Sequence, residues 1–181
     1  MAPDRRGLLA EPCAVVVDDR GHVYVASAGG PRLHAVQRFT AEGRFLGSYR
    51  AFGVAGEAFN SARALALSKQ HLFVADAGNG AVHVFQRGGA FRQVFSTATR
   101  HGERSFPVSL ALCGVDGLLV LDRGDTHALR RFTRAGNFVG DALAGVPIDA
   151  PIAVAAGSGV RSRSSTWMAS AFRAFTPTDR W

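Results

Sequence analysis

The sequence has almost no lysine, little cysteine and no long apolar run. It contains 20 arginines and a single lysine, Lys69. No run of 18 apolar residues occurs, so a membrane-spanning helix is excluded. Charged residues and Pro12 interrupt the first 17 positions, and we therefore expect no secretory signal. Cys13 and Cys113 are too few for a disulfide framework or a zinc site, so we expect buried free thiols. A reducing, cytoplasmic compartment is favoured.

What is present describes a folded globular domain. Of the 181 residues, 47% are hydrophobic and 19% are charged, a balance that allows a sizeable core and argues against disorder. The net charge of +7 raises the hypothesis of nucleic-acid binding, because a basic surface gains affinity for phosphate by releasing counterions. The excess of arginine over lysine is also what a GC-rich coding sequence produces. Whether the charge indicates nucleic-acid binding therefore depends on where the arginines lie.

The chain repeats itself with a period of about 46 residues. Phenylalanines that end an apolar run stand at Phe39, Phe85 and Phe132, and each is followed four residues later by a turn glycine and six residues later by a second phenylalanine. Upstream of them lie three further apolar runs that end in a polar turn, at 23–27, 72–76 and 118–122. Landmarks that keep one spacing indicate a repeat architecture.

Each unit contains four short runs rich in Val, Leu, Phe and Tyr, because another apolar run precedes these at 14–17, 64–67 and 109–112. Glycine, aspartate and asparagine turns divide the runs, which leaves no room for helices of 10 to 15 residues. Four antiparallel strands per unit make a blade of a β-propeller. The fold class is therefore predicted as all-β: a partial propeller of about three four-stranded blades, plus an extra strand at 150–155.

The second unit carries enough residues to resemble a known family. Gly56-Glu57-Ala58-Phe59-Asn60, the runs at 64–67 and 72–76, the segment 79–85 and Gly89-Ala90-Phe91 are similar to the NHL repeat. The resemblance spans about residues 11 to 145. It implies a propeller whose turn residues Asp76 and Asn79 hold the turn shape through hydrogen bonds, a structural role. Ser27 replaces the expected aspartate in the first unit, so a different turn is expected there.

NHL propellers usually close with six blades, whereas this chain supplies three. We expect an N-terminal extension over 1–10, blades over 11–156, and a flexible basic tail over 157–181 that is poorly ordered or forms a short helix at its end. An arc of three blades leaves one packing face and its strand edges uncovered. The chain is therefore interpreted as part of a longer protein, with self-association through the open blade edges as the alternative.

Turns after the second and fourth strands of each blade share one face of a propeller, here named the first face, and the other turns share the second face. Counted from the sequence, each face has an excess of one positive charge, so neither forms a basic platform. On the first face, four arginines are the candidate contacts for a macromolecule: Arg50, Arg100, Arg104 and Arg123. His22 and His71 lie on the second face at equivalent repeat positions, which the repeat explains better than a metal does.

No nucleotide-binding loop, nucleophile turn or paired carboxylate motif is present, and we expect neither a cofactor nor a metal. The resemblance therefore implies a non-catalytic module that binds a protein partner as a scaffold and does not enter a membrane. The first alternative is an RNA-binding propeller face. The second is a fragment of a propeller enzyme of the lyase or lactonase type, whose site would need residues from the whole ring.

Overall fold

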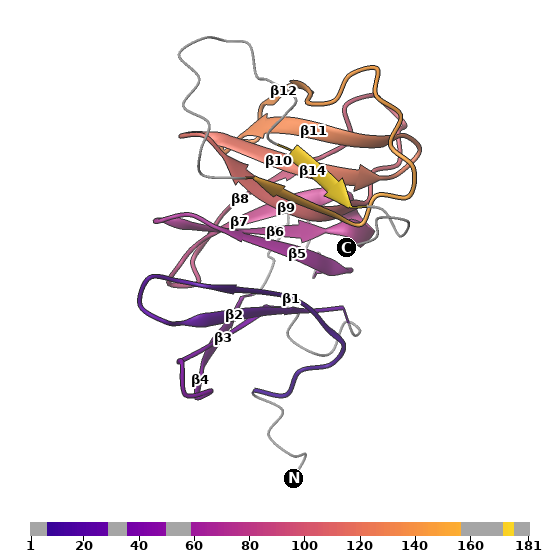
Figure 1. Cartoon of the computed structure of the whole chain (residues 1–181). Helices are drawn as coiled ribbons and strands as arrows, with labels where there is room; N and C mark the ends of the chain where they lie inside the picture. Colours follow the sequence, from indigo (N-terminus) through magenta and orange to yellow (C-terminus); the bar gives the residue numbers. More distant parts are fainter. Residues whose placement is uncertain (1–6, 29–35, 50–58, 157–171, 176–181) are drawn as a thin grey trace.

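The computed structural model describes residues 7–28, 36–49, 59–156 and 172–175. It contains three antiparallel four-stranded sheets, stacked in chain order from indigo to orange (Figure 1). Blade 1 consists of β1 (Pro12–Val17), β2 (Val23–Ser27), β3 (Val36–Phe39) and β4 (Phe45–Tyr49). Blade 2 consists of β5 (Ala62–Leu67), β6 (His71–Asp76), β7 (Ala81–Gln86) and β8 (Phe91–Ser96), with the 3-10 turn η1 (Ala77–Asn79) after β6. Blade 3 consists of β9 (Pro107–Cys113), β10 (Gly117–Arg123), β11 (His127–Thr133) and β12 (Phe138–Asp141). The prediction of an all-β partial propeller is confirmed.

The first strand of each blade is innermost, and β1, β5, β9 and β13 (Ala153–Ala156) lie next to one another in that order. Each of the first three is interrupted by a register shift at the same place, which leaves one residue outside the pairing with the second strand. The residues left out are Cys13, Arg63 and Val108. Such a shift is typical of a β-bulge, which changes the direction of a side chain.

The apolar core forms between successive blades. The phenylalanine at or next to the end of the third strand of each blade packs edge-on against the one that begins the fourth, with ring centroids 5.9 Å apart in blade 1, 5.7 Å in blade 2 and 5.5 Å in blade 3. Phe85 also meets Tyr49 of blade 1, and Phe132 meets Phe95 of blade 2. The recurring aromatics therefore face the preceding blade, as the repeat predicts.

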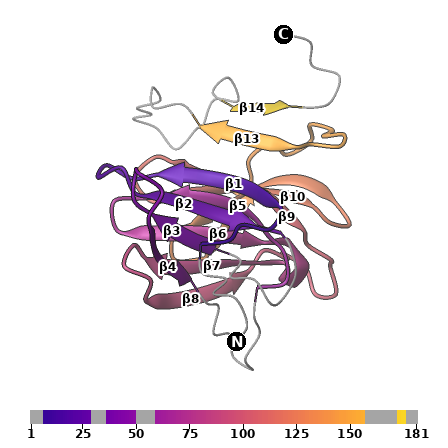
Figure 2. The same ribbon diagram turned by 90° about the horizontal axis from the view of Figure 1, so that it is seen from below.

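A fourth sheet follows blade 3. Strand β13 pairs antiparallel with β14 (Phe172–Phe175), and Val154 packs onto the far side of blade 3. Figure 2 shows β13 between the blades and β14. The expectation of a short helix or no structure near the C-terminus is wrong at 172–175, which form strand β14. Most of the predicted tail lies outside the described residues.

Blade 1 has one open face. Val15 and Val17, at positions where blade 2 presents packed leucines, are 62% and 58% exposed. The segment before β1 covers only part of this face: Gln37 accepts a hydrogen bond from the Gly7 N–H at 3.0 Å and donates to the Leu8 carbonyl at 2.7 Å. Within the described residues, no helix is long and apolar enough to cross a membrane.

Candidate functional site

A hollow opens where the innermost strands meet the first face. Its volume is about 580 Å³. We call it the axial hollow, lined by Cys13, Ser61, Arg63, Ala77, Gly78, Phe106, Val108, Arg123 and Ile152. The three residues that the register shifts leave unpaired all belong to this lining. The bulges therefore turn one side chain of each blade toward the propeller axis.

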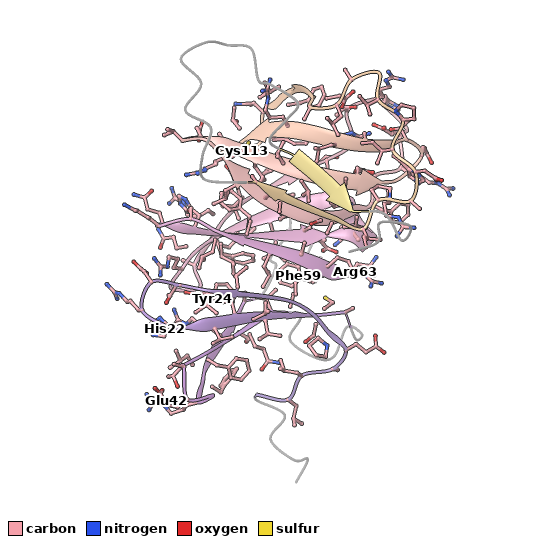
Figure 3. All side chains as sticks on the ribbon, viewed as in Figure 1. His22, Tyr24, Glu42, Phe59, Arg63 and Cys113 are labelled. Atoms are coloured by element: carbon pink, nitrogen blue, oxygen red, sulfur yellow. The ribbon has the colours of Figure 1, made fainter. Side chains whose placement is uncertain are left out.

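Arg63 is positioned by its own strand. It lies near the start of β5, where Figure 3 shows it on the side of the molecule opposite His22 and Glu42. Its Nε donates to Ser61 Oγ at 3.0 Å. This bond uses one guanidinium donor and leaves the two terminal amino groups free to reach into the hollow.

Ser61 is fixed in turn by the buried carboxylate of Asp76. Asp76 accepts hydrogen bonds from the Ser61 N–H at 2.8 Å and from the Asn79 side chain at 2.8 Å. Burial alone would raise the pKa of Asp76, but hydrogen bonds from His83 and from the backbone of Ser61 and Asn60 hold it below its ordinary value. Asp76 is therefore a carboxylate that holds the turn, the structural role expected from the sequence.

The same device recurs in blade 3. Asp122, also fully buried, accepts hydrogen bonds from the Phe106 N–H at 3.2 Å and the Gly124 N–H at 2.7 Å. The next residue after Asp122 is Arg123, whose backbone N–H donates to the Phe106 carbonyl at 3.0 Å. The aspartates thus fix the rim of the hollow on both sides, and Arg123 projects from this rim.

In blade 1 the aspartate is replaced by Ser27, whose buried hydroxyl has no hydrogen-bond partner among the described atoms. The backbone bond survives, because the Ala28 N–H donates to the Glu11 carbonyl at 3.0 Å. Glu11 takes a left-handed backbone with φ +51°, unlike its counterparts Ser61 and Phe106. The backbone before β1 therefore differs from that of the other blades, whereas the turn after Ser27, where the sequence predicts a difference, lies at 29–35 outside the described residues.

Cys13 links blades 1 and 2 at the hollow. Its thiol donates to the Ala62 carbonyl, with sulfur and oxygen 3.0 Å apart. Partial burial raises the pKa of the Cys13 thiol, against the opposing charge of Arg63, so the thiol stays protonated at neutral pH. The expectation of two buried thiols holds for Cys113 and is wrong for Cys13, which is exposed because the bulge turns it into the open axial hollow.

Of the arginines predicted as contacts, only Arg123 lines the axial hollow. Arg100 and Arg104 are exposed on the loop before β9, and Arg100 lines a smaller, separate pocket of about 190 Å³. Arg50 lies outside the described residues. Arg63 lines the hollow without being among the predicted contacts, and its place at the bulge distinguishes it from other surface arginines.

Beneath the first face, blade 3 holds a buried ionic cluster. Arg130, 2% exposed, is bonded to Glu103, to Asp122 at 3.3 Å and to the Thr97 carbonyl of blade 2 at 2.6 Å. Burial would raise the pKa of Glu103, but hydrogen bonds from the Thr99 backbone and Thr126, together with the Arg130 charge, lower it to about 2. Three acidic side chains beneath the first face are therefore buried: Asp76, Glu103 and Asp122.

On the second face, Arg87 of blade 2 reaches across to blade 1. Its guanidinium lies 2.6 Å from Asp18 and 2.5 Å from Asp19, and Asp18 also lies 3.0 Å from His22 Nδ1. Burial would raise the pKa of Asp18, but the bonds from Arg87 and His22 lower it below its ordinary range. His22 is thus engaged with Asp18. Within the described residues, no group of three or more His, Cys, Asp or Glu could hold a metal ion.

No family model and no curated protein matches the chain. Its structure is similar to that of streptogramin B lyase, with a TM-score of 0.64, 15% identity and coverage of 86% of this chain and 47% of that one. It is also similar to the WD40 repeats of RRP9, with a TM-score of 0.61, 16% identity and coverage of 81% and 42%. The computationally designed Ika4 protein gives a TM-score of 0.55, 14% identity and coverage of 80% and 79%. The chain thus spans less than half of the first two proteins, and these likenesses show its fold, an arc of a β-propeller.

Proposed function

We propose that this chain is a non-catalytic propeller module of the NHL type that binds another protein through its first face. The observation that carries the proposal is the axial hollow. It combines two exposed arginines with apolar groups, and buried aspartates fix its rim. A preformed concave site of this kind binds a partner at little cost in ordering its own loops.

The similarity to WD40 domains supports a binding module but does not decide between kinds of partner, because one fold hosts many functions. The NHL assignment rests on the sequence motifs alone. The residues proposed as contacts remain Arg50, Arg100, Arg104 and Arg123, with Arg63 added.

The test is affinity capture followed by mapping of the contact face. The purified chain should retain a protein partner in stoichiometric amount after nuclease treatment, both at physiological and at about 1 M salt. The variant Arg100→Glu/Arg104→Glu should lose this partner. The matched second-face variant Arg44→Glu/Lys69→Glu should keep it. Retention by the first variant and loss by the second would contradict the proposal.

RNA binding is the second candidate, and the observation that favours it is the exposure of Arg63, Arg100, Arg104 and Arg123 on one face. This candidate predicts affinity for single-stranded RNA that falls steeply as salt rises. Substituting Arg100 and Arg104 by Ala should weaken the binding further. Weak affinity that is the same in the wild type and in the variant with Arg100 and Arg104 replaced by Ala would indicate charge attraction only.

An enzymatic role is the third candidate, favoured by the similarity to a lyase. Elemental analysis of the purified protein would test it, because a bound metal in stoichiometric amount would favour a propeller enzyme over a binding module.

Self-association through the open face of blade 1 is a separate expectation. Sedimentation of the wild type and of Val15→Glu/Val17→Glu should reveal it as a dimer that the variant loses.

A further inference from the structure

The charge of the axial hollow is not balanced within its walls. Two guanidinium groups, Arg63 and Arg123, line it, and no carboxylate of the described residues does. Within the same part of the chain, Arg63 donates to Ser61 alone, and the Arg123 side chain has no ion pair. The arginines that serve the fold differ, since Arg87 and Arg130 are each paired with two carboxylates. The hollow therefore presents two cations available to a ligand.

The Arg63 guanidinium and the Arg123 backbone are held in place before any ligand arrives. Arg63 stands at the bulge of β5, and its Nε is fixed by Ser61, which Asp76 holds. Arg123 follows Asp122 directly, and its backbone is bonded to Phe106. A guanidinium with a fixed stem loses little freedom when it binds, and its planar fork matches the two oxygens of a carboxylate.

The remaining lining is apolar. Phe106 and Ile152 stand at the rim, 43% and 51% exposed, with Val108 and Ala77 beside them. The volume of about 580 Å³ lies within the range of ligand sites, roughly 300 to 1,000 Å³. A ligand that fills this hollow must offer both an anion and an apolar group.

A peptide segment meets this demand better than a nucleic acid does. Outside the hollow, the backbone of Arg104 is bonded to Asp125, and that of Arg100 to Glu103, so carboxylates lie close to these arginines. The unbalanced charge is thus concentrated at one point and does not form the extended basic track that a phosphate backbone requires.

We propose that the axial hollow binds an acidic peptide segment of the protein partner. The Asp or Glu carboxylates of this segment pair with Arg63 and Arg123, and a neighbouring apolar side chain packs against Phe106 and Ile152. This inference rests on the proposed function and names the chemistry of its partner.

The experiment measures binding of the whole chain to three arrays of peptides about 12 residues long, randomised except for two central positions. The central pair is Asp-Glu in the first array, Asn-Gln in the second and two phosphoserines in the third. We expect preferential binding to the Asp-Glu array, strongest where an apolar residue adjoins the pair. Charge-assisted bonds predict that Arg63→Gln and Arg123→Gln each weaken binding about tenfold or more.

Arg44→Gln is the matched control, because it removes the same charge from an exposed position on the second face. It should leave binding unchanged. Equal binding to the Asp-Glu and Asn-Gln arrays overturns the proposal, and so does an equal loss in Arg44→Gln. Binding to the phosphoserine array alone, or displacement of the peptides by single-stranded RNA, assigns the hollow to phosphate and overturns it too.

The two proposals fail in different ways. A captured partner that is lost on changing Arg100 and Arg104, but kept by Arg63→Gln and Arg123→Gln, leaves the proposed function standing and rejects the acidic segment. Absence of any captured protein, together with no array preference, rejects both. Far-ultraviolet circular dichroism of each variant must match the wild type, as expected for exposed side chains.

Discussion

The interface between blades 1 and 2 and the interface between blades 2 and 3 share one apolar design and differ in their polar parts. Across the first, Tyr49 and Phe85 lie 5.4 Å apart; across the second, Phe95 and Phe132 lie 5.5 Å apart. The first places its ion pairs at the edge, where Arg87 is 19% exposed. The second buries Arg130 beneath the first face, at 2% exposure. The repeat thus fixes the aromatic contacts, while polar residues differ from blade to blade.

The largest expected effect comes from removing the buried cation. Arg130→Ala leaves Glu103 and Asp122 without their counter-charge and should lower the free energy of unfolding by about 3 to 5 kcal/mol. Urea denaturation measures it. Arg104→Ala, at an exposed position in the same blade, should cost less than about 0.5 kcal/mol. Similar losses of unfolding free energy in the two variants would show that the buried cluster stabilises the fold no more than an exposed arginine does.

The next largest effect is the pH dependence of the buried cluster at the second interface. Because the pKa of Glu103 is lowered to about 2 from 4.5, its contribution to stability is complete above pH 4.5 and is lost as the pH falls toward 2. The part due to Glu103 is on the order of 2 kcal/mol. The free energy of unfolding of Glu103→Gln should therefore change less than that of the wild type between about pH 5 and pH 2. An unchanged pH profile would contradict this assignment.

Arg87→Ala tests the ion pairs at the edge of the first interface. Asp18 would keep its bonds from His22 and Tyr24, so we expect a smaller loss of about 1 to 2 kcal/mol. Thermal and urea unfolding give the value. Asp19→Asn serves as the control, because Asp19 is 72% exposed and its solvent-screened pair with Arg87 should contribute little to the free energy of unfolding. A loss in Arg87→Ala as large as in Arg130→Ala would remove the contrast between the interfaces.

The smallest effect is expected for Tyr49→Phe. The Tyr49 hydroxyl donates to the Arg87 carbonyl at 2.6 Å, while the ring packs on Phe85. Removing only the hydroxyl should cost about 1 kcal/mol and leave the ring contact intact. A cost below the error of urea titration would show that the first interface depends on apolar contact alone.

The sequence predicts the strands well because glycine and phenylalanine landmarks repeat with each blade. It also places His22 on the second face, and the structure has His22 on the side of the molecule opposite Arg63 of the axial hollow (Figure 3). The charge of the faces could not be predicted this way. Asp76 and Asp122 count as surface charges in the sequence, whereas the structure buries both, and Arg130 stands in a strand where a buried cation is not expected.

The candidate site was predicted only at Arg123. Cys13 and Arg63 reach the axis because a one-residue register shift leaves them out of the strand pairing, and no residue type marks such a shift in the sequence. Burial and pairing among Arg130, Glu103 and Asp122 depend likewise on contacts between distant segments. These features can be recognised only once the three-dimensional arrangement of the strands is known.

In each blade, the repeated bulge separates the one side chain that faces the axial hollow from the paired residues that hold the sheet together. A side chain that stands outside the ladder can be exchanged without altering any strand pairing, since its neighbours keep their partners. Cysteine, arginine and valine occupy this position in three successive blades, although the surrounding sheets are alike. The side chains that line the propeller axis can therefore differ from blade to blade while the architecture stays the same.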